Sequence, residues 1–102
     1  MTIVSDNRQL LRELSDKLKQ EDIIVKPIKV TASKDDKLTL QEIAQFVIEN
    51  PELSKDIIEM VIEEFRKLHN QEHIYVLKKN GEKITYEEYK EMSLAERSEH
   101  IF

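Results

Sequence analysis

The chain has 102 residues and a formal net charge of −5, with no cysteine and a single glycine. The lack of cysteine excludes disulfides and thiolate metal sites, and one glycine is too few for a phosphate-binding loop, so we expect neither a cofactor nor an enzyme. The length predicts one domain, 1–102, and no apolar run reaches the ~18 residues of a membrane helix. The first residues lack the pattern of a signal peptide, so we expect a soluble, cytoplasmic protein with no membrane contact.

Residues 1–37 are predicted to form a helix followed by an edge strand. The helix runs from Ser5 to Gln20, because its leucines recur at helical spacing and form one narrow stripe: Leu10, Leu11, Leu14 and Leu18. The β-branched run from Ile23 to Val30 predicts a strand, and Pro27 confines it to a sheet edge because proline has no N–H to donate. Residues 31–37 are predicted to be a hinge loop.

Two apolar helices are predicted next. The first, from Leu40 to Glu49, begins at Thr39 and Glu42, which have the spacing of a capping box. Asn50-Pro51 ends it and starts the second helix, from Leu53 to Leu68. The apolar side chains of the second helix cover an arc of roughly 200°, about twice what a surface helix needs, so we expect this helix to be covered on two sides. They are Leu53, Ile57, Ile58, Met60, Val61, Ile62, Phe65 and Leu68.

A β-hairpin is predicted over residues 74–86. Asn80-Gly81 is the pair that a two-residue type I′ turn prefers, and alternating β-branched and aromatic residues lie on both sides of it. Such a turn fixes which residues face each other across the hairpin, namely Leu77 with Ile84 and Tyr75 with Tyr86.

Residues 87–102 are predicted to form a helical tail. Two pairs have the spacing of a capping box and indicate two short helices: Thr85 with Glu88, and Ser93 with Glu96.

One short string carries possible metal chemistry. Residues 69–73 match the H-x-x-E-H pattern of inverted zinc proteases, in which two histidines hold zinc and the glutamate activates water. The only further histidine is His100, and the string lies where the second helix is expected to end. A solvated, structural role is the favoured interpretation, so we predict no catalytic and no metal-binding residue, and a metal-dependent hydrolase using His69, Glu72 and His73 is only the third hypothesis.

The order of elements resembles a winged helix over roughly residues 38–86. Leu38-Thr39-Leu40-Gln41-Glu42-Ile43-Ala44 resembles the opening helix of a helix-turn-helix, and Ile74-Tyr75-Val76 with Asn80-Gly81 resembles the wing. The residues with the spacing of a recognition helix are Ser54, Ile58, Ile62 and Phe65. The resemblance implies a small α+β domain whose second helix and wing contact DNA.

Charge on the second helix separates the two leading functions. Its exposed side carries Asp56, Glu59 and Glu63, where a DNA reader would place basic and amide side chains. We therefore predict a non-enzymatic protein-interaction or regulatory module with a protein partner, and composition alone associates such a chain with a bacterial or phage origin. The alternative is a winged-helix transcriptional regulator that binds duplex DNA. The candidate partner-binding residues are Tyr75, Tyr86, Lys78, Lys79 and Lys83.

Overall fold

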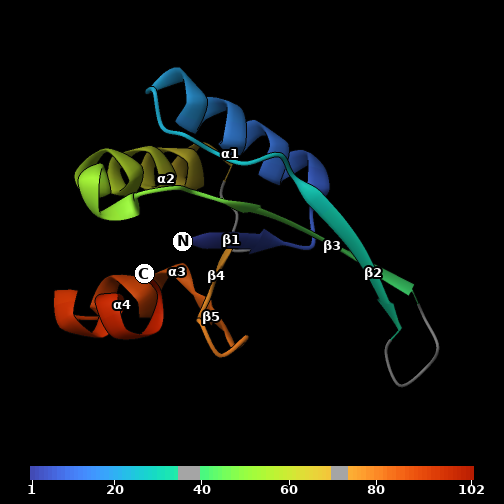
Figure 1. Cartoon of the computed structure of the whole chain (residues 1–102). Coiled ribbons are helices and arrows are strands. Elements are labelled where there is room, and N and C mark those ends of the chain that lie inside the picture. Colours follow the sequence, from blue (N-terminus) through green and yellow to red (C-terminus); the bar gives the residue numbers. More distant parts are fainter. Residues whose placement is uncertain (35–39, 70–73) are drawn as a thin grey trace.

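A five-stranded antiparallel sheet organises the part of the chain that the computed structural model describes, residues 1–34, 40–69 and 74–102 (Figure 1). Its strands are β1 (Thr2–Ser5), β2 (Lys29–Lys34), β3 (Leu40–Val47), β4 (Tyr75–Leu77) and β5 (Lys83–Thr85). The helices are α1 (Arg8–Gln20), the short 3₁₀ helix η1 (Pro51–Leu53), α2 (Lys55–His69), α3 (Tyr86–Glu91) and α4 (Leu94–His100). This confirms a small α+β architecture. None of the described helices is long and apolar enough to cross a bilayer.

The strand order in the sheet is β2-β3-β1-β4-β5. Along the chain the elements up to β4 run β1-α1-β2-β3-α2-β4, with 3₁₀ helix η1 before α2. This is the split β-α-β arrangement of ferredoxin-like topologies, to which β5 adds one further strand. In this arrangement β1 lies in the middle of the sheet and β2 lies at one edge.

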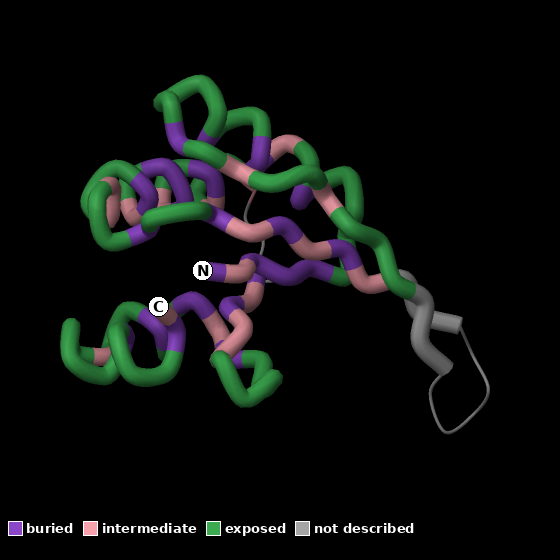
Figure 2. The backbone as a smooth tube through the Cα atoms, viewed as in Figure 1, coloured by how far each residue is buried: buried purple, intermediate pink, exposed green. Residues whose placement is uncertain are grey.

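One face of the sheet carries the hydrophobic core. Ile3 pairs with Phe46 on one side and with Val76 on the other, and all three side chains are buried. The helices cover this face with the residues Leu10, Leu11, Leu14 and Leu18 of α1 and Ile58, Val61, Ile62 and Phe65 of α2. Figure 2 shows β1 buried along most of its length and the outer turns of the helices exposed. The opposite face holds Val4 between Gln45 and Tyr75, and none of these three belongs to the core cluster.

The helix predicted from Leu40 to Glu49 is wrong, because this stretch is strand β3. Its apolar residues fit a helical period, yet Ala44, Phe46 and Ile48 also fit the period of two, and they are the ones buried in the structure. β3 pairs with β2 and with β1, so ladders on both sides override its local helical preference. Thr39 of the expected capping box lies outside the described residues. The helix-turn-helix predicted within residues 38–86 is therefore replaced by a strand, η1 and α2.

The N-terminal prediction was right in part. The helix begins at Arg8, where the Asn7 side chain accepts a hydrogen bond from the Leu10 N–H at 3.0 Å, and Thr2–Ser5 forms the unexpected strand β1. The expected edge strand exists, but it begins at Lys29, and Val25 contributes only an isolated bridge to Ile48. Part of the predicted hinge loop belongs to β2, and residues 35–37 of it lie outside the described residues.

The hairpin is confirmed, with a register shifted by one residue. The Lys78 N–H donates to the Glu82 carbonyl at 2.8 Å and the Gly81 N–H donates to the Lys78 carbonyl at 2.9 Å, so the loop spans three residues rather than two. Gly81 alone in this loop has a positive φ, +90°, whereas a type I′ turn needs two. The shift pairs Val76 with Ile84 and Tyr75 with Thr85. A slip of one residue exchanges the faces, which places Tyr86 in the core and Tyr75 on the open face.

Replacing Gly81 with valine is expected to lower the free energy of unfolding by about 1 kcal/mol or more, because a β-branched side chain resists positive φ. No heavy atom lies within 4 Å of a Cβ added there, so the cost comes from the backbone alone. Gly81→Asn is the matched control, since asparagine tolerates the left-handed region. Urea unfolding of both variants measures the difference, and a valine variant as stable as the asparagine variant would contradict this turn geometry.

Both capping boxes of the tail are confirmed. The Thr85 hydroxyl accepts from the Glu88 N–H at 3.1 Å, and the Ser93 hydroxyl accepts from the Glu96 N–H at 3.2 Å. The backbone and side chain of Ser93 donate hydrogen bonds to the Glu96 carboxylate, and these bonds lower the pKa of that carboxyl. These caps start α3 and α4, and the turn between the two helices brings α4 back against α2.

Candidate functional site

Half of the wide apolar arc on the second helix is left uncovered. Ile58, Val61, Ile62 and Phe65 face the sheet and are buried. Leu53 of η1, just before α2, and Leu68 near its end are 80% and 76% exposed, and Ile57 and Met60 are 40% and 45% exposed. The prediction that this helix is covered on two sides therefore holds only in part: the core and the tail both contact α2, but half of the predicted apolar arc stays exposed and is available to another molecule.

Four apolar side chains meet in one groove beside the start of α2. Leu53 and Ile57 lie on one wall, and Leu94 of α4 and Phe102 lie on the other. The groove has a volume of about 600 Å³ and is open to solvent. Leu94 is 61% exposed, so this wall is also accessible. We call this feature, lined by Leu53, Ile57, Leu94 and Phe102, the apolar groove.

The buried Arg97 guanidinium holds α4 in place to form the second wall. Its Nη1 donates to Glu59 Oε1 at 2.7 Å, its Nε to the Tyr89 carbonyl at 3.2 Å and its Nη2 to the Lys90 carbonyl at 3.1 Å. The guanidinium carbon also lies 4.4 Å from the centre of the Tyr89 ring. Arg97 thus joins α2, α3 and α4 at one point. Only 7% of its side chain is exposed, so these contacts are screened little by water.

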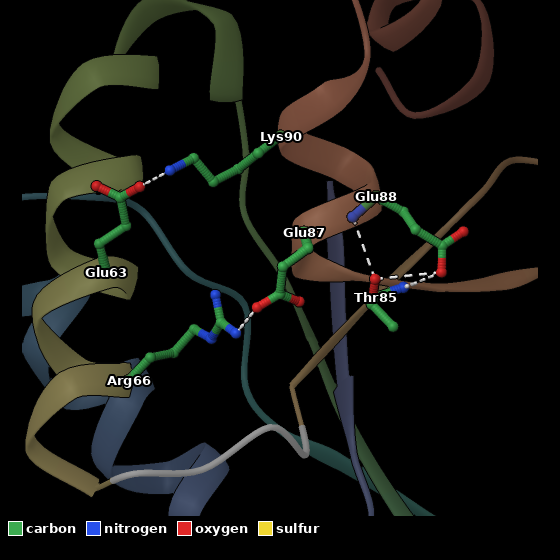
Figure 3. A network of polar contacts seen from close by, with 6 residues as sticks. All are labelled: Glu63, Arg66, Thr85, Glu87, Glu88 and Lys90. Atoms are coloured by element: carbon green, nitrogen blue, oxygen red, sulfur yellow. Dashed lines mark hydrogen bonds and ion pairs between the residues drawn. The ribbon is translucent and has the colours of Figure 1, made fainter.

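Two further ion pairs align α3 along α2. Figure 3 shows Arg66 and Glu63 of α2 pointing toward Glu87 and Lys90 of α3, and each pair is in contact. Each is partly exposed and contributes little to stability alone, typically about 0–1 kcal/mol. Together the two pairs fix the position of α3 along α2. Because α4 follows α3 in the chain, they also help to determine the position of Leu94.

The rim of the groove carries more negative than positive charge. Glu52 and Asp56 line it together with a single cation, Lys55. The remaining polar lining comes from Ser54 and Ser98. An apolar floor with an acidic rim favours a ligand that is apolar on one side and basic at its margin.

The two tyrosines of the hairpin are separated by the sheet. Tyr86 has no exposed surface, its hydroxyl has no hydrogen-bond partner among the described residues, and burial raises its pKa. It is therefore inaccessible to any partner in this conformation. Tyr75 is half-buried on the open face, and the Lys83 Nζ lies 4.3 Å from its ring centre.

The other two predicted lysines lie at the start of the hairpin loop, Lys78 just before it and Lys79 within it, and both already have partners. The Lys78 ammonium lies 3.5 Å from the Glu82 carboxylate, and the Lys79 ammonium donates to the Ser98 carbonyl at 3.3 Å. The Lys79 N–H also donates to the His100 carbonyl at 2.7 Å, which fastens the loop to α4. The structure thus brings Tyr75 and Lys83 together, but directs Lys79 toward the tail.

The histidine string is only partly within the described chain. His69 is the last residue of α2, its ring lies 4.3 Å from that of Phe65, and its Nε2 lies 3.5 Å from Glu13 Oε2. Glu72 and His73 lie outside the described residues. Across residues 1–34, 40–69 and 74–102, no three histidine and acidic side chains are grouped as metal ligands would be.

Sequence reasoning missed the groove, although one signal pointed toward it. The arc of α2 was too wide for a helix with a single partner, but it was interpreted as a sign of a second covered side, whereas part of it is exposed. The sequence did not predict that Leu94 and Phe102 line the groove with this side of α2. Their position depends on the contacts of Arg97 and on the ion pairs of α3. Comparison of the chain with models of protein families, with curated proteins and with solved structures gave no match.

Proposed function

We propose that this domain is a protein-interaction module that binds an amphipathic helical segment of a partner protein in the apolar groove. The observation that carries the proposal is the gathering of exposed Leu53, Ile57 and Leu94 around one open groove. Single exposed apolar residues are ordinary, but several of them lining one open groove are typical of a binding surface.

The shape of the groove favours a helix as its occupant. It lies where η1 and the first turn of α2 face α4, and its volume of about 600 Å³ accommodates a few side chains rather than a domain. An amphipathic helix presents apolar side chains at i, i+3 or i+4 and i+7 on one face, which is the common way of filling such a groove. Glu52 and Asp56 on the rim favour lysine or arginine next to those apolar positions.

Duplex DNA binding, the alternative function, has less support from the geometry. Lys78, Lys79 and Lys83 would have to supply the phosphate contacts, yet each interacts with a neighbour in the chain. The half-buried acids Glu59 and Glu63 of α2 are paired with Arg97 and Lys90, so the tail covers the side of α2 that a recognition helix would present. We therefore favour a protein partner.

A selection from a library of helical peptides displayed on phage tests this function. Enriched peptides are expected to share apolar residues at helical spacing with adjacent lysine or arginine. Their affinity should fall by ~10-fold or more in the double variant Leu53→Ser, Leu94→Ser, since each leucine contributes about 1.5–3 kcal/mol when fully buried. Both side chains are exposed in the free protein, so the fold should be retained.

Leu68→Ser is the matched control, because Leu68 is equally exposed but lies outside the groove. It should bind the selected peptides as the wild type does. The proposal fails if the double variant binds them equally well, or if no peptide family is enriched. Binding of a duplex DNA probe below micromolar concentration at ~0.15 M salt would instead favour the alternative.

A further inference from the structure

The outer edge of β2 has no strand beside it. β2 is the first strand in the sheet order and pairs only with β3, so one row of its backbone N–H and C=O groups has no sheet partner among the described residues. Such an edge can accept an extended segment from another chain. Figure 1 shows β2 at the far end of the sheet from α4, so this edge is remote from the apolar groove.

A cleft of about 400 Å³ lies next to this edge, between α1 and the approach to β2. Pro27, Ile28 and Val30 line it on the strand side. Val30 pairs with Ala44, whose side chain lies on the helix-covered face, and Val30 is nonetheless 40% exposed. Residues directly opposite each other on neighbouring strands share a face, so the side chains of an added strand that lie beside Val30 would enter the cleft.

The helix side of the cleft is cationic. Arg8, Arg12 and Lys19 line it, and the only acid there is Asp16. The three cations recur at i, i+4 and i+11 on α1, which places them on one face of the helix. None of them forms an ion pair in the part of the chain that the structure describes. In a chain with a net charge of −5, this is a local reversal of sign.

We propose that the β2 edge binds an extended, acidic segment of a partner protein. The segment adds to the sheet as a strand beside β2, and its backbone pairs with the free edge. Side chains on its inner face enter the cleft beside Ile28 and Val30, where acidic ones approach Arg8 and Arg12, and the alternate side chains lie on the opposite face of the sheet. This site shares no residue with the apolar groove and does not depend on the function proposed there.

A second copy of the chain fits this edge poorly. Pairing β2 with the β2 of another copy would bring Lys29 and the cations of α1 toward their own counterparts, and like charges in such positions repel. Lysine and proline on an edge strand also protect against aggregation, and this role alone explains Lys29 and Pro27. Protection against aggregation does not explain Arg8 and Arg12, because they lie on α1 and not on the edge strand. They line the cleft beside the edge, where they can contact a bound segment.

Titration of the ¹⁵N-labelled protein with an eight-residue peptide of alternating glutamate and valine tests the proposal. The amide signals of Lys29, Val30 and Thr31 and of the cationic face of α1 are expected to shift. Affinity should fall at least ~10-fold in the double variant Arg8→Glu, Arg12→Glu, whose side chains are exposed, and a peptide of alternating lysine and valine should not bind. Lys67→Glu, an exposed charge reversal on α2, is the matched control and should bind normally.

Backbone methylation separates strand addition from charge attraction alone. Two peptides are compared, one N-methylated at its odd positions and the other at its even positions. In one of them the methyl groups lie on the edge that must pair with β2, so this peptide should not bind. In the other they lie on the opposite edge, so binding should be retained. Equal binding by both methylated peptides, absence of binding, or self-association through β2 would overturn the proposal. The Leu53→Ser, Leu94→Ser variant should bind the acidic peptide unchanged, which keeps this result distinct from that of the groove.

Discussion

Replacing Arg97 with methionine is expected to lower the free energy of unfolding by about 2–4 kcal/mol, because truncating one partner of a buried, hydrogen-bonded ion pair leaves the other uncompensated. Arg97 of α4 makes three hydrogen bonds, one to α2 and two to α3, and its side chain is almost fully buried. Glu59 is 21% exposed, so water can solvate it in part, and the expected loss is smaller than for a fully enclosed pair. Methionine fills a similar volume, which isolates the polar contribution.

Arg66→Met is the matched control for this change. Arg66 also pairs with a glutamate, between α2 and α3, but its partner Glu87 is 56% exposed, so we expect a loss of about 1 kcal/mol or less. Urea unfolding followed by circular dichroism measures both variants. Equal losses would show that Arg97 does not hold α4. A folded Arg97→Met variant should also lose affinity for groove-selected peptides, since Leu94 is positioned through α4.

Replacing Phe46 with alanine is expected to cost about 3–5 kcal/mol of stability, the usual range for emptying the place of a buried aromatic ring. Phe46 is 1% exposed and lies in β3 opposite Ile3, in the centre of the core. Its neighbour Val47 lies on the other face of the sheet and is only half-buried. Val47→Ala should therefore cost about 1 kcal/mol or less, because much of its side chain already contacts water.

The contrast between these neighbours distinguishes a strand from a helix. In a helix over residues 40–49, Phe46 and Val47 would both belong to the apolar arc, and both alanine variants would be strongly destabilised. In a strand their side chains point to opposite faces, and only Phe46 matters. Thermal unfolding of the two single variants suffices as the measurement. Comparable losses would contradict the assignment of β3.

Elements marked by local signals were predictable from the sequence. The boxes at Thr85 and Ser93 and the spacing of apolar residues in α2 act within one turn of helix, and the structure contains each of these elements. Asn80-Gly81 likewise marked a hairpin, but the same dipeptide fits both a two-residue turn and a three-residue loop that ends in a left-handed glycine. Local sequence did not distinguish them, so the pairing of Tyr75 was predicted one residue out of register.

Elements that depend on distant partners were not predictable in the same way. Thr2–Ser5 is short and becomes a strand only because β3 and β4 bind its two sides, while β3 carries a pattern that suits a helix equally well. The functional surfaces share this dependence. The apolar groove requires α4 to return to η1, and the cationic cleft requires the face of α1 with Arg8 and Arg12 to lie beside Val30. Neither proximity follows from spacing along the chain.

The central place of β1 has a consequence for biosynthesis. Of the five strands it is the first to be translated, yet its neighbours β3 and β4 end only at Val47 and Leu77. At about 5–20 residues per second, roughly several seconds of translation separate Ile3 from the strand that closes its second side. Throughout that interval at least one of the two strands that pair with β1 has not yet been synthesised. The speed of folding is thus set by the joining of distant segments, and the well-capped helices do little to hasten it.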